Sequence, residues 1–396
     1  MSTLPPPGVT TMSNSNFISV IPKDSIGVSH THRGSQQEPQ NTTMDSGWPV
    51  NFTLPREMAF NDDNLVSVIA YSCLFLIAAT GNLTVFITLF RSRGFKSRVN
   101  SFIMHLSVAD LIVAFIMLPM EIAWHITVSW KAGDFACRLM MFFRAFGFYL
   151  SSFTLVTISL DRYFSIVHPL SLHDAERRGK IMLTVAWTLS VVASLPQSVI
   201  FHVEQHPVFT WFEQCVTFNF FPSQSHELAY NLFNVITVYV MPLVVITTSY
   251  CLILCKIYRN STMVKGERHI PVLRGSRGSR GTIRCSSAGK IGKAKIRTLK
   301  MTLVIVSVFI LCWTPYFFMA ALWWFDRDAA SKVDPKVQRG LFLFTVSNAC
   351  MDPIVYGMFT ATFRREAKKW SAYVMWKLSK IHSANNPRRR DQDCYI

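Results

Sequence analysis

Seven stretches of the chain are apolar over a length that can cross a lipid bilayer. Each reaches the roughly 20 residues that an α-helix needs to span a hydrocarbon core about 30 Å thick. They lie at residues 65–90, 99–128, 135–167, 181–203, 228–257, 299–325 and 340–360. None shows the alternation of apolar and polar residues that marks a membrane β-strand. The sequence therefore predicts an all-α fold, a seven-helix membrane bundle over residues 63–363.

Charge is scarce and unevenly placed along the chain. Only 16% of the residues are charged, although the formal net charge is +17. Many of the 40 Lys and Arg fall into short segments outside the apolar stretches, at 91–98, 177–180, 256–300 and 364–390. Basic loops stay on the cytosolic side. We therefore expect a multi-pass plasma-membrane protein with its N-terminus outside and its C-terminus in the cytosol. We expect no binding to nucleic acid, because the basic residues follow membrane topology.

The N-terminal segment 1–62 has the composition of a disordered tail. It is rich in Ser, Thr, Pro, Asn and Gln and has few large apolar residues. No basic start followed by a short apolar run is visible, so we expect no cleavable signal peptide. Sequons begin at Asn41 and Asn51. Because both lie in the outer tail, we expect both to be glycosylated.

Two cytosolic segments have patterns of their own. Residues 259–294 are basic and rich in Gly and Ser, which predicts a flexible third cytosolic loop. Residues 361–396 should form a short amphipathic helix on the membrane lipid, followed by a cytosolic tail. Its apolar positions are spaced by three or four residues, at Phe363, Ala367, Trp370 and Val374. The alternative is a cluster of basic residues that only flanks the membrane.

The cysteines support the same topology. Of the nine cysteines, only Cys137 and Cys215 fall on the expected outer side, outside the predicted helix interiors. An oxidising exterior with two candidates predicts a single disulfide between the third helix and the second outer loop. The alternative is a pair of buried free thiols.

Polar residues inside the apolar stretches are costly and need partners. Asn82, Asp110, Asn348 and Asp352 fall in mid-helix. They predict an intramembrane site for a cation or a proton, with a sodium ion near Asp110 as the bound species. The alternative is an inter-helix hydrogen-bond network that only fixes packing. We expect no other cofactor and no resident metal. No motif of a soluble enzyme is present, so catalysis is not expected.

Several motifs of this sequence resemble those of a known family, the rhodopsin-like G-protein-coupled receptors. The resemblance rests on three motifs, Asp161-Arg162-Tyr163, Cys312-Trp313-Thr314-Pro315-Tyr316 and Asp352-Pro353-Ile354-Val355-Tyr356. Further residues agree in the expected segments: Gly81, Asn82, Leu106, Ser107, Val108, Ala109, Asp110, Trp187, Pro196, Pro242 and Tyr250. The ordered set extends over about three quarters of the 396 residues and is very specific.

The resemblance implies an activation switch. Asp161 would pair with Arg162 at rest, and release would turn Arg162 toward a heterotrimeric G protein. The sixth helix would swing about Pro315. The implied switch residues are Asp161, Arg162, Tyr163, Tyr250, Phe309, Trp313, Pro315, Asp352, Pro353 and Tyr356. Arrestin and receptor kinases are further implied partners. Lys295 stands where relatives often have an acid, so a second resting-state lock is not expected.

Within the family, the chain is similar to the gonadotropin-releasing-hormone receptor group. Three features carry this: Asp352 before Pro353, Glu121 eleven residues after Asp110, and Arg144 eighteen before Arg162. Two outer segments, 201–207 and 214–218, look most like insect receptors for adipokinetic hormone or its corazonin-related cousin. The resemblance implies a peptide-hormone receptor. Receptors for corazonin or for vasopressin- and oxytocin-like peptides are alternatives.

The expected ligand site lies in the outer halves of the helices. Glu121 and Arg144 would each be costly alone, so we expect them to face each other or a ligand. Around them we expect an aromatic, mostly neutral cup suited to a blocked peptide. The candidate residues are Glu121, Trp124, His125, Arg144, Phe148, Tyr149, Asn231, Asn234, Tyr316, Phe317, Trp323, Trp324 and Phe342. The aromatics have an alternative reading as core or as a membrane-interface belt, Trp323 and Trp324 especially.

Three other functions of membrane proteins fit less well. A retinal pump would need a lysine in the middle of the seventh helix, and none occurs between Lys336 and Lys368. A transporter would be expected to show inverted repeats and broken helices, and neither is visible in the sequence. A passive adhesion or scaffold protein does not explain Arg162, Trp313 and Asp352 together.

Overall fold

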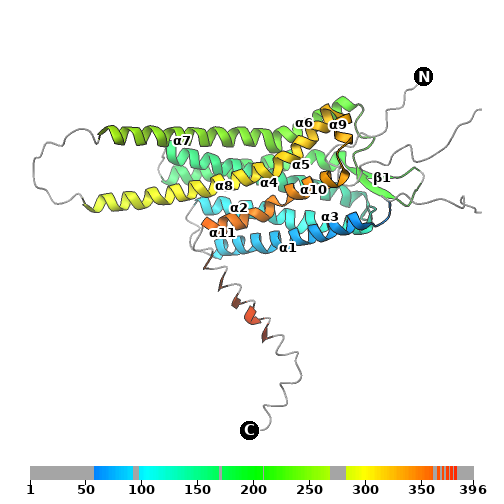
Figure 1. Ribbon diagram of the computed structural model, residues 1–396, viewed down its shortest axis with the longest axis horizontal. Helices are drawn as coiled ribbons and strands as arrows, with labels where there is room; N and C mark the ends of the chain where they lie inside the picture. Colours follow the sequence, from blue (N-terminus) through cyan, green and yellow to red (C-terminus); the bar gives the residue numbers. More distant parts are fainter. Residues whose placement is uncertain are drawn as a thin grey trace, which may run out of the picture.

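The computed structural model describes residues 58–91, 98–168, 172–207, 209–267 and 282–359, and part of 364–380. Among these residues, seven helical spans are long and apolar enough to cross a membrane. They lie side by side as an elongated bundle (Figure 1). The predicted all-α, seven-helix fold is confirmed. The glycosylation sites predicted at Asn41 and Asn51 lie outside the described residues.

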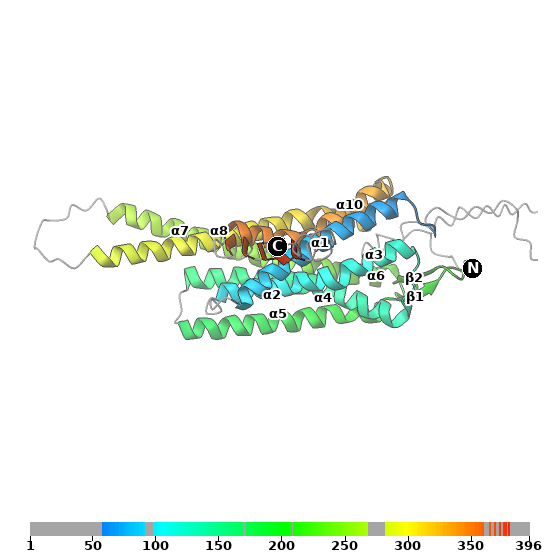
Figure 2. The same ribbon diagram turned by 90° about the horizontal axis from the view of Figure 1, so that it is seen from below.

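The first four spans are continuous helices apart from one wide turn. They are α1 (Asp62–Arg91), then α2 (Arg98–Ile112) continued by a π-helical turn and α3 (Leu118–Thr127), then α4 (Gly133–Val167) and α5 (Leu172–Ile200). In two views α4 runs through the middle of the bundle (Figures 1 and 2), and it packs against α2, α5 and α7.

Of the last three spans, the fifth and the seventh are assembled from shorter pieces. The fifth span consists of α6 (Gln224–Val235), a second π-helical turn and α7 (Met241–Glu267). The sixth is α8 (Thr282–Phe325), followed by the short α9 (Arg327–Ser331). The seventh consists of α10 (Pro335–Val346) and α11 (Asn348–Phe359), which are joined at Ser347.

Several helices are longer than their apolar stretches. The fourth helix begins at Leu172 and not at residue 181. α7 and α8 extend into the range 259–294 that was predicted to be a flexible loop, while 268–281 lies outside the described residues. Hydropathy marks only the part of a helix that lies in hydrocarbon. A helix that continues past the membrane in polar residues therefore cannot be delimited in this way.

Two π-helical turns precede prolines. Val113–Met117 lies before Pro119, and Ile236–Val240 lies before Pro242. A proline cannot donate a backbone hydrogen bond, and its ring collides with the carbonyl four residues earlier. The wider turn accommodates both defects and rotates everything beyond it around the helix axis. The turn before Pro119 thus helps to set which way Glu121 faces.

A short hairpin closes one end of the bundle, which we call the hairpin end. Strand β1 (His202–Gln205) pairs antiparallel with β2 (Glu213–Val216), with Val203 opposite Cys215. Cys215 forms the disulfide with Cys137 that the sequence predicted. The hairpin between α5 and α6 is therefore tied to the start of α4.

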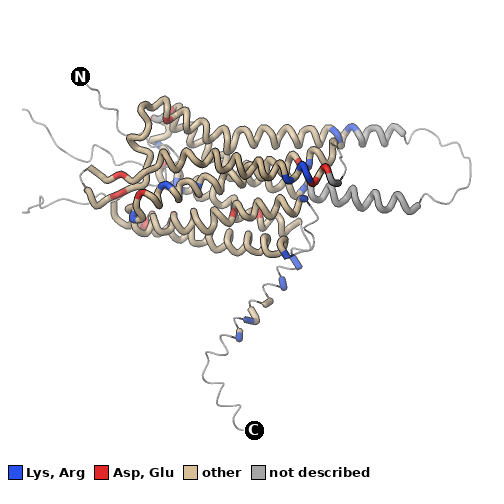
Figure 3. Tube along the Cα trace, turned by 180° about the vertical axis from the view of Figure 1, so that it is seen from behind, with Lys and Arg blue, Asp and Glu red and all other residues tan. Residues whose placement is uncertain are grey.

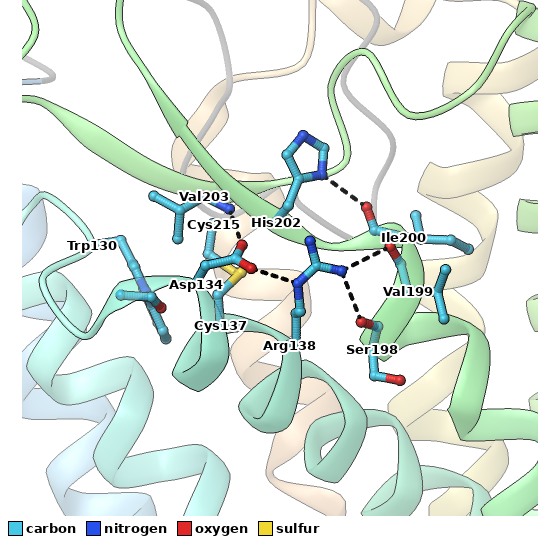
Figure 4. A network of polar contacts seen from close by, with 11 residues as sticks. Trp130, Asp134, Cys137, Arg138, Ser198, Val199, Ile200, His202, Val203 and Cys215 are labelled. Atoms are coloured by element: carbon cyan, nitrogen blue, oxygen red, sulfur yellow. Dashed lines mark hydrogen bonds and ion pairs between the residues drawn. A yellow bond between two sulfur atoms is a disulfide. The ribbon is translucent and has the colours of Figure 1, made fainter.

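Polar contacts also hold strand β1 of the same hairpin against α4 (Figure 4). The Asp134 carboxylate accepts hydrogen bonds from the Val203 backbone N–H at 2.9 Å and from Arg138 Nε at 2.6 Å. Arg138 also donates to the carbonyl oxygens of Ser198 and Val199, each at 3.3 Å. These contacts join the end of α5, the start of β1 and the start of α4.

Lys and Arg gather at the opposite end of the bundle (Figure 3), which we call the Arg162 end. Beyond α11, the described residues among 364–380 are helical and exposed. They lead away from the bundle (Figure 1). The apolar positions predicted for the amphipathic helix lie outside the described residues, as do the side chains of 260–267 and 282–298, which include Lys295.

Candidate functional site

A cavity opens toward the hairpin end between α4, α6, α8 and α10. It encloses about 760 Å³ of empty space, including its open mouth. Nine of the thirteen predicted ligand residues line it: Arg144, Phe148, Tyr149, Asn231, Asn234, Tyr316, Phe317, Trp324 and Phe342. The wall is mostly aromatic and aliphatic, with a few amide groups and one guanidinium.

A buried ion pair forms one side of this cavity. Arg144 Nη1 lies 3.2 Å from Glu121 Oε1, and the exposed fractions of the two side chains are 13% and 1%. The guanidinium carbon of Arg144 also lies 4.8 Å from the centre of the Phe342 ring. The pairing predicted from the sequence is thus present. Glu121 is behind Arg144 and neutralises it, so the cavity presents hydrogen-bond donors without a net charge.

Three predicted ligand residues lie away from the cavity wall. Trp124 donates from Nε1 to Gln214 Oε1 at 2.8 Å, which attaches α3 to strand β2. His125 is buried against the ring of Tyr71, with 5.3 Å between ring centres. Trp323 packs in a separate apolar cluster at the end of α8. Helix position alone did not reveal this, because rotation about the axis decides which side chains face inward.

Several wall residues were not predicted from the sequence. Met141 and Phe201 line the cavity, and so does Gln197, which donates to the Tyr230 hydroxyl at 2.6 Å. Gln197 is a polar residue inside an apolar stretch, so the reasoning applied to Asn82 could have found it. Met141 and Phe201 carried no such signal.

Some polar groups of the cavity wall form hydrogen bonds with one another. The Tyr149 hydroxyl donates to Asn234 Oδ1 at 2.7 Å. Asn231 is buried on the same helix, α6, and lines the cavity beside it. Hydrogen bonds of this kind fix side-chain directions before any ligand enters.

The inner wall of the cavity is a cluster of aromatic rings around Trp313. The centre of its ring lies 5.0 Å from that of Phe148, 5.4 Å from that of Phe317 and 5.8 Å from that of Phe309. The Tyr239 hydroxyl is 2.5 Å from Thr314 Oγ1, one residue before Pro315. Movement of α8 therefore has to rearrange the rings that border the cavity.

The Arg162 end has its own buried charge cluster. Asp161 is fully buried and forms ion pairs with Arg162 and with Arg98, whose Nη1 lies 2.9 Å from Asp161 Oδ1. The pair with Arg162 was expected, whereas Arg98 had been counted only as a topology signal. Tyr250 and Tyr356 are buried in the adjacent core cluster. Tyr163 is half-buried and packs against Phe164.

Between the two ends lie the intramembrane polar residues. Asn82 donates to the Ala349 carbonyl at 2.8 Å and to that of Ala78 at 3.0 Å, so it joins α1 to α11. Asp110 and Asp352 are buried side by side. Asn348 is buried in the first turn of α11. Among the described residues, no group of three or more His, Cys, Asp and Glu could hold a metal ion.

Comparison with known proteins places this architecture. Residues 81–356 match the 7 transmembrane receptor (rhodopsin family) model. The chain belongs to the rhodopsin family of seven-transmembrane receptors. It is 38% identical to a gonadotropin-releasing hormone II receptor of Clarias gariepinus, over 76% of this chain and 77% of the relative.

Two further relatives have similar identities to this chain. A gonadotropin-releasing hormone receptor of Octopus vulgaris is 34% identical over 81% of this chain and 78% of its own length. A receptor of that name from Mus musculus is 32% identical over 68% of this chain and 80% of its own length. The resemblance to the gonadotropin-releasing-hormone receptor group is thereby confirmed, and this family is one of receptors rather than enzymes.

Proposed function

We propose that the receptor binds a blocked peptide hormone of the gonadotropin-releasing-hormone type in the cavity at its hairpin end. The observation that carries this is the neutralised Arg144 in an aromatic wall. A peptide without terminal charges brings carbonyl groups and aromatic rings, which match guanidinium donors and ring faces. The cavity is open at its mouth, so it can take one end of a peptide while the rest stays outside.

The finer proposal is a peptide of the adipokinetic hormone or corazonin-related class. It is supported by the sequence around the hairpin, at 201–207 and 214–218. In this proposal the hairpin end faces outward, since secreted peptides arrive there and the disulfide needs an oxidising exterior. The basic Arg162 end then faces the cytosol, in keeping with the positive-inside rule.

Signalling would pass through the Arg162 end to a heterotrimeric G protein. The peptide would displace the rings around Trp313, and α8 would swing outward about Pro315, where the helix lacks a backbone hydrogen bond. Arg162 would then leave Asp161 and enter the space that opens. Arrestin and receptor kinases would act on the same end after activation, and the basic segment after α11 would rest on lipid.

A cation or a shared proton would neutralise Asp110 and Asp352. Two adjacent carboxylates in a buried site cannot both remain ionised without such a partner. If sodium takes this place, 150 mM NaCl should raise the melting temperature of the purified receptor relative to choline chloride, and Asp110→Asn should abolish the difference. Equal melting temperatures in the two salts would favour the proton.

The ligand proposal is tested by expressing the chain in cells and applying a panel of synthetic blocked peptides. The panel contains gonadotropin-releasing hormones, adipokinetic hormones, corazonin and vasopressin-like peptides, with calcium and cyclic AMP as readouts. Cells expressing Arg162→Ala serve as the matched control, which should bind the active peptide without responding. Silence toward every peptide at normal surface expression would contradict the proposal.

A further inference from the structure

Arg98 makes contacts with two other helices that its place in a basic segment did not predict. It begins α2, yet its guanidinium reaches the buried end of α4 and lies 2.9 Å from Asp161 Oδ1. It donates as well to the Ala175 carbonyl of α5 at 3.1 Å and to the Ser165 hydroxyl at 3.4 Å. Its side chain is 22% exposed, against 0% for Asp161. One guanidinium thus joins three helices around one carboxylate.

The three helices held by Arg98 pack closely at this point. Phe102, one turn further along α2, is buried, and a side chain added at Gly179 would meet its ring at 3.3 Å and the Arg98 Cδ at 3.7 Å. Among the residues whose side chains the structure describes, α8, the helix proposed to swing, contributes none of the groups that Arg98 contacts. Arg98 therefore belongs to the part of the bundle that stays in place when α8 moves.

Asp161 needs such a partner. Because its side chain is fully buried, an ionised carboxylate without an opposite charge would cost several kcal/mol. In the resting arrangement two guanidinium groups share the carboxylate, one on each oxygen. If Arg162 were the sole partner, its departure would strand the charge and oppose activation.

We propose that Arg98 is a positioning residue that keeps Asp161 paired while Arg162 leaves, and so lowers the free-energy cost of activation. The inference rests on the proposed function, in which Arg162 leaves Asp161 when α8 swings. It predicts the opposite of what a second resting-state lock would do. Loss of Arg98 should make the receptor harder to activate, whereas loss of a lock would raise its basal activity.

The test measures directly how far α8 moves away from α4 at the Arg162 end, which we call opening. Genetically encoded spin labels replace two exposed residues, His168, which follows the last residue of α4, and Lys300, within α8. The receptor in nanodiscs is mixed with nucleotide-free Gs, Gi or Gq heterotrimers, and the distance distribution gives the open fraction. Arg98→Gln should lower the equilibrium constant for opening about tenfold or more. Arg177→Gln, which removes an exposed charge on α5, is the matched control and should open like the wild type.

Two further variants separate charge from packing. Arg98→Lys keeps a cation and should open within about threefold of the wild type. In an Asp161→Asn background there is no carboxylate to strand when Arg162 leaves, so adding Arg98→Gln should have no further effect on opening. If Arg98→Gln alone does not fold, the inference is still tested by two measurements. One is the opening of Arg98→Lys, and the other is the comparison of Asp161→Asn with the double mutant Asp161→Asn, Arg98→Gln.

The outcomes that overturn the inference are distinct from failure of the proposed function. Wild-type opening or increased opening in Arg98→Gln would overturn it. So would an equal loss in Arg98→Lys, or an added loss when Arg98→Gln is combined with Asp161→Asn. If the wild type itself opens with none of the three G proteins, the proposed function fails instead.

Discussion

At the scale of single residues, the chemistry of the cavity depends on one buried ion pair. Arg144 lines the wall and Glu121 stands behind it, 3.2 Å away. Removing one partner from a buried pair strands the other charge, which costs more than the pair contributes. The face of Phe342 contacts the same guanidinium and limits its freedom. The amides of Asn231 and Asn234 add polar contacts without charge.

The ion pair predicts a specific pattern of mutant effects on peptide potency. Glu121→Gln and Arg144→Gln should each raise the half-maximal concentration about tenfold or more, on the order of 1.4 kcal/mol. Because the two side chains contact each other, the double mutant should be no worse than the poorer single mutant. A dose–response series for the three variants checks this. Additive losses would mean that each charge holds a separate part of the peptide.

Arg162 should act on signalling and not on binding. It lies at the end opposite the cavity, paired with Asp161. Arg162→Ala should therefore keep peptide affinity within about threefold, less than 1 kcal/mol, while the second-messenger response is lost. Radioligand binding and calcium release on the same cells provide the measurement. A full response at normal surface expression would refute the role.

At the scale of elements, the close approach of α4 to the second span positions the ion pair. A Cβ atom at Gly147 would lie 2.8 Å from Val113 Cγ2, in the π-helical turn before Pro119. Only glycine allows this approach without a shift. The turn and the close packing together set the distance between the α3 segment that carries Glu121 and the α4 segment that carries Arg144.

Gly147→Ala should consequently destabilise the receptor. The added methyl group forces Val113 out of place, and overpacking of this kind costs about 1–3 kcal/mol. The melting temperature of the purified protein should fall, and peptide potency should fall with it. Val113→Ala opens space, so the double mutant should melt at a higher temperature than Gly147→Ala alone. An unchanged melting temperature for Gly147→Ala would show that the turn yields easily.

The hairpin should loosen in acid. Burial lowers the pKa of His206, whose Nδ1 accepts a hydrogen bond from the Phe209 N–H at 3.1 Å. As the pH falls through about 6.5, the unfolded hairpin binds a proton before the folded one, so stability is full above that pH and declines below it. Exchange of the Phe209 amide, corrected for its intrinsic rate, should be faster at pH 5.5 than at 7.5. His206→Gln should remove the difference.

At the scale of the whole molecule, the two functional ends are separated by the length of the bundle and joined by α4. Its hairpin end carries Cys137 and Arg144, and its other end carries Asp161 and Arg162. α8 borders the cavity with Trp313 and extends beyond the bundle at the Arg162 end (Figure 1). A rigid central helix beside a proline-containing one is an arrangement in which a small change in the cavity can move the far end.

The disulfide should be required for the hairpin end of the bundle. Its two cysteines are 78 residues apart, and closing a loop of that size contributes about 4 kcal/mol in the chain-entropy model. Cys137→Ser and Cys215→Ser should each lower surface expression and peptide binding together. The exposed free cysteine Cys73 offers the control, because Cys73→Ser should leave both unchanged. Normal binding in either disulfide mutant would make the bridge dispensable.

The number of helices and several buried contacts can be predicted from the sequence alone because lipid does not solvate polar or charged groups. Backbone groups in hydrocarbon must be paired within a helix, so apolar length determines how many helices there are. Isolated charges are costly there, so Glu121 and Arg144 could be expected to face each other or a ligand. The cysteine pattern likewise predicted the Cys137–Cys215 bond, which the structure confirms.

The tertiary structure decided which features depend on the rotation of a helix about its axis and on the length of a side chain. Proline-linked π-helical turns rotate the segments beyond them, which no hydropathy pattern records. Trp124 consequently holds the hairpin instead of lining the cavity. Gln197 reaches the wall through the packing of α5. A long flexible side chain such as Arg98 can leave its own loop and bind a buried carboxylate on another helix. Which charge it finds depends on how three helices pack, and that information is not local in the sequence.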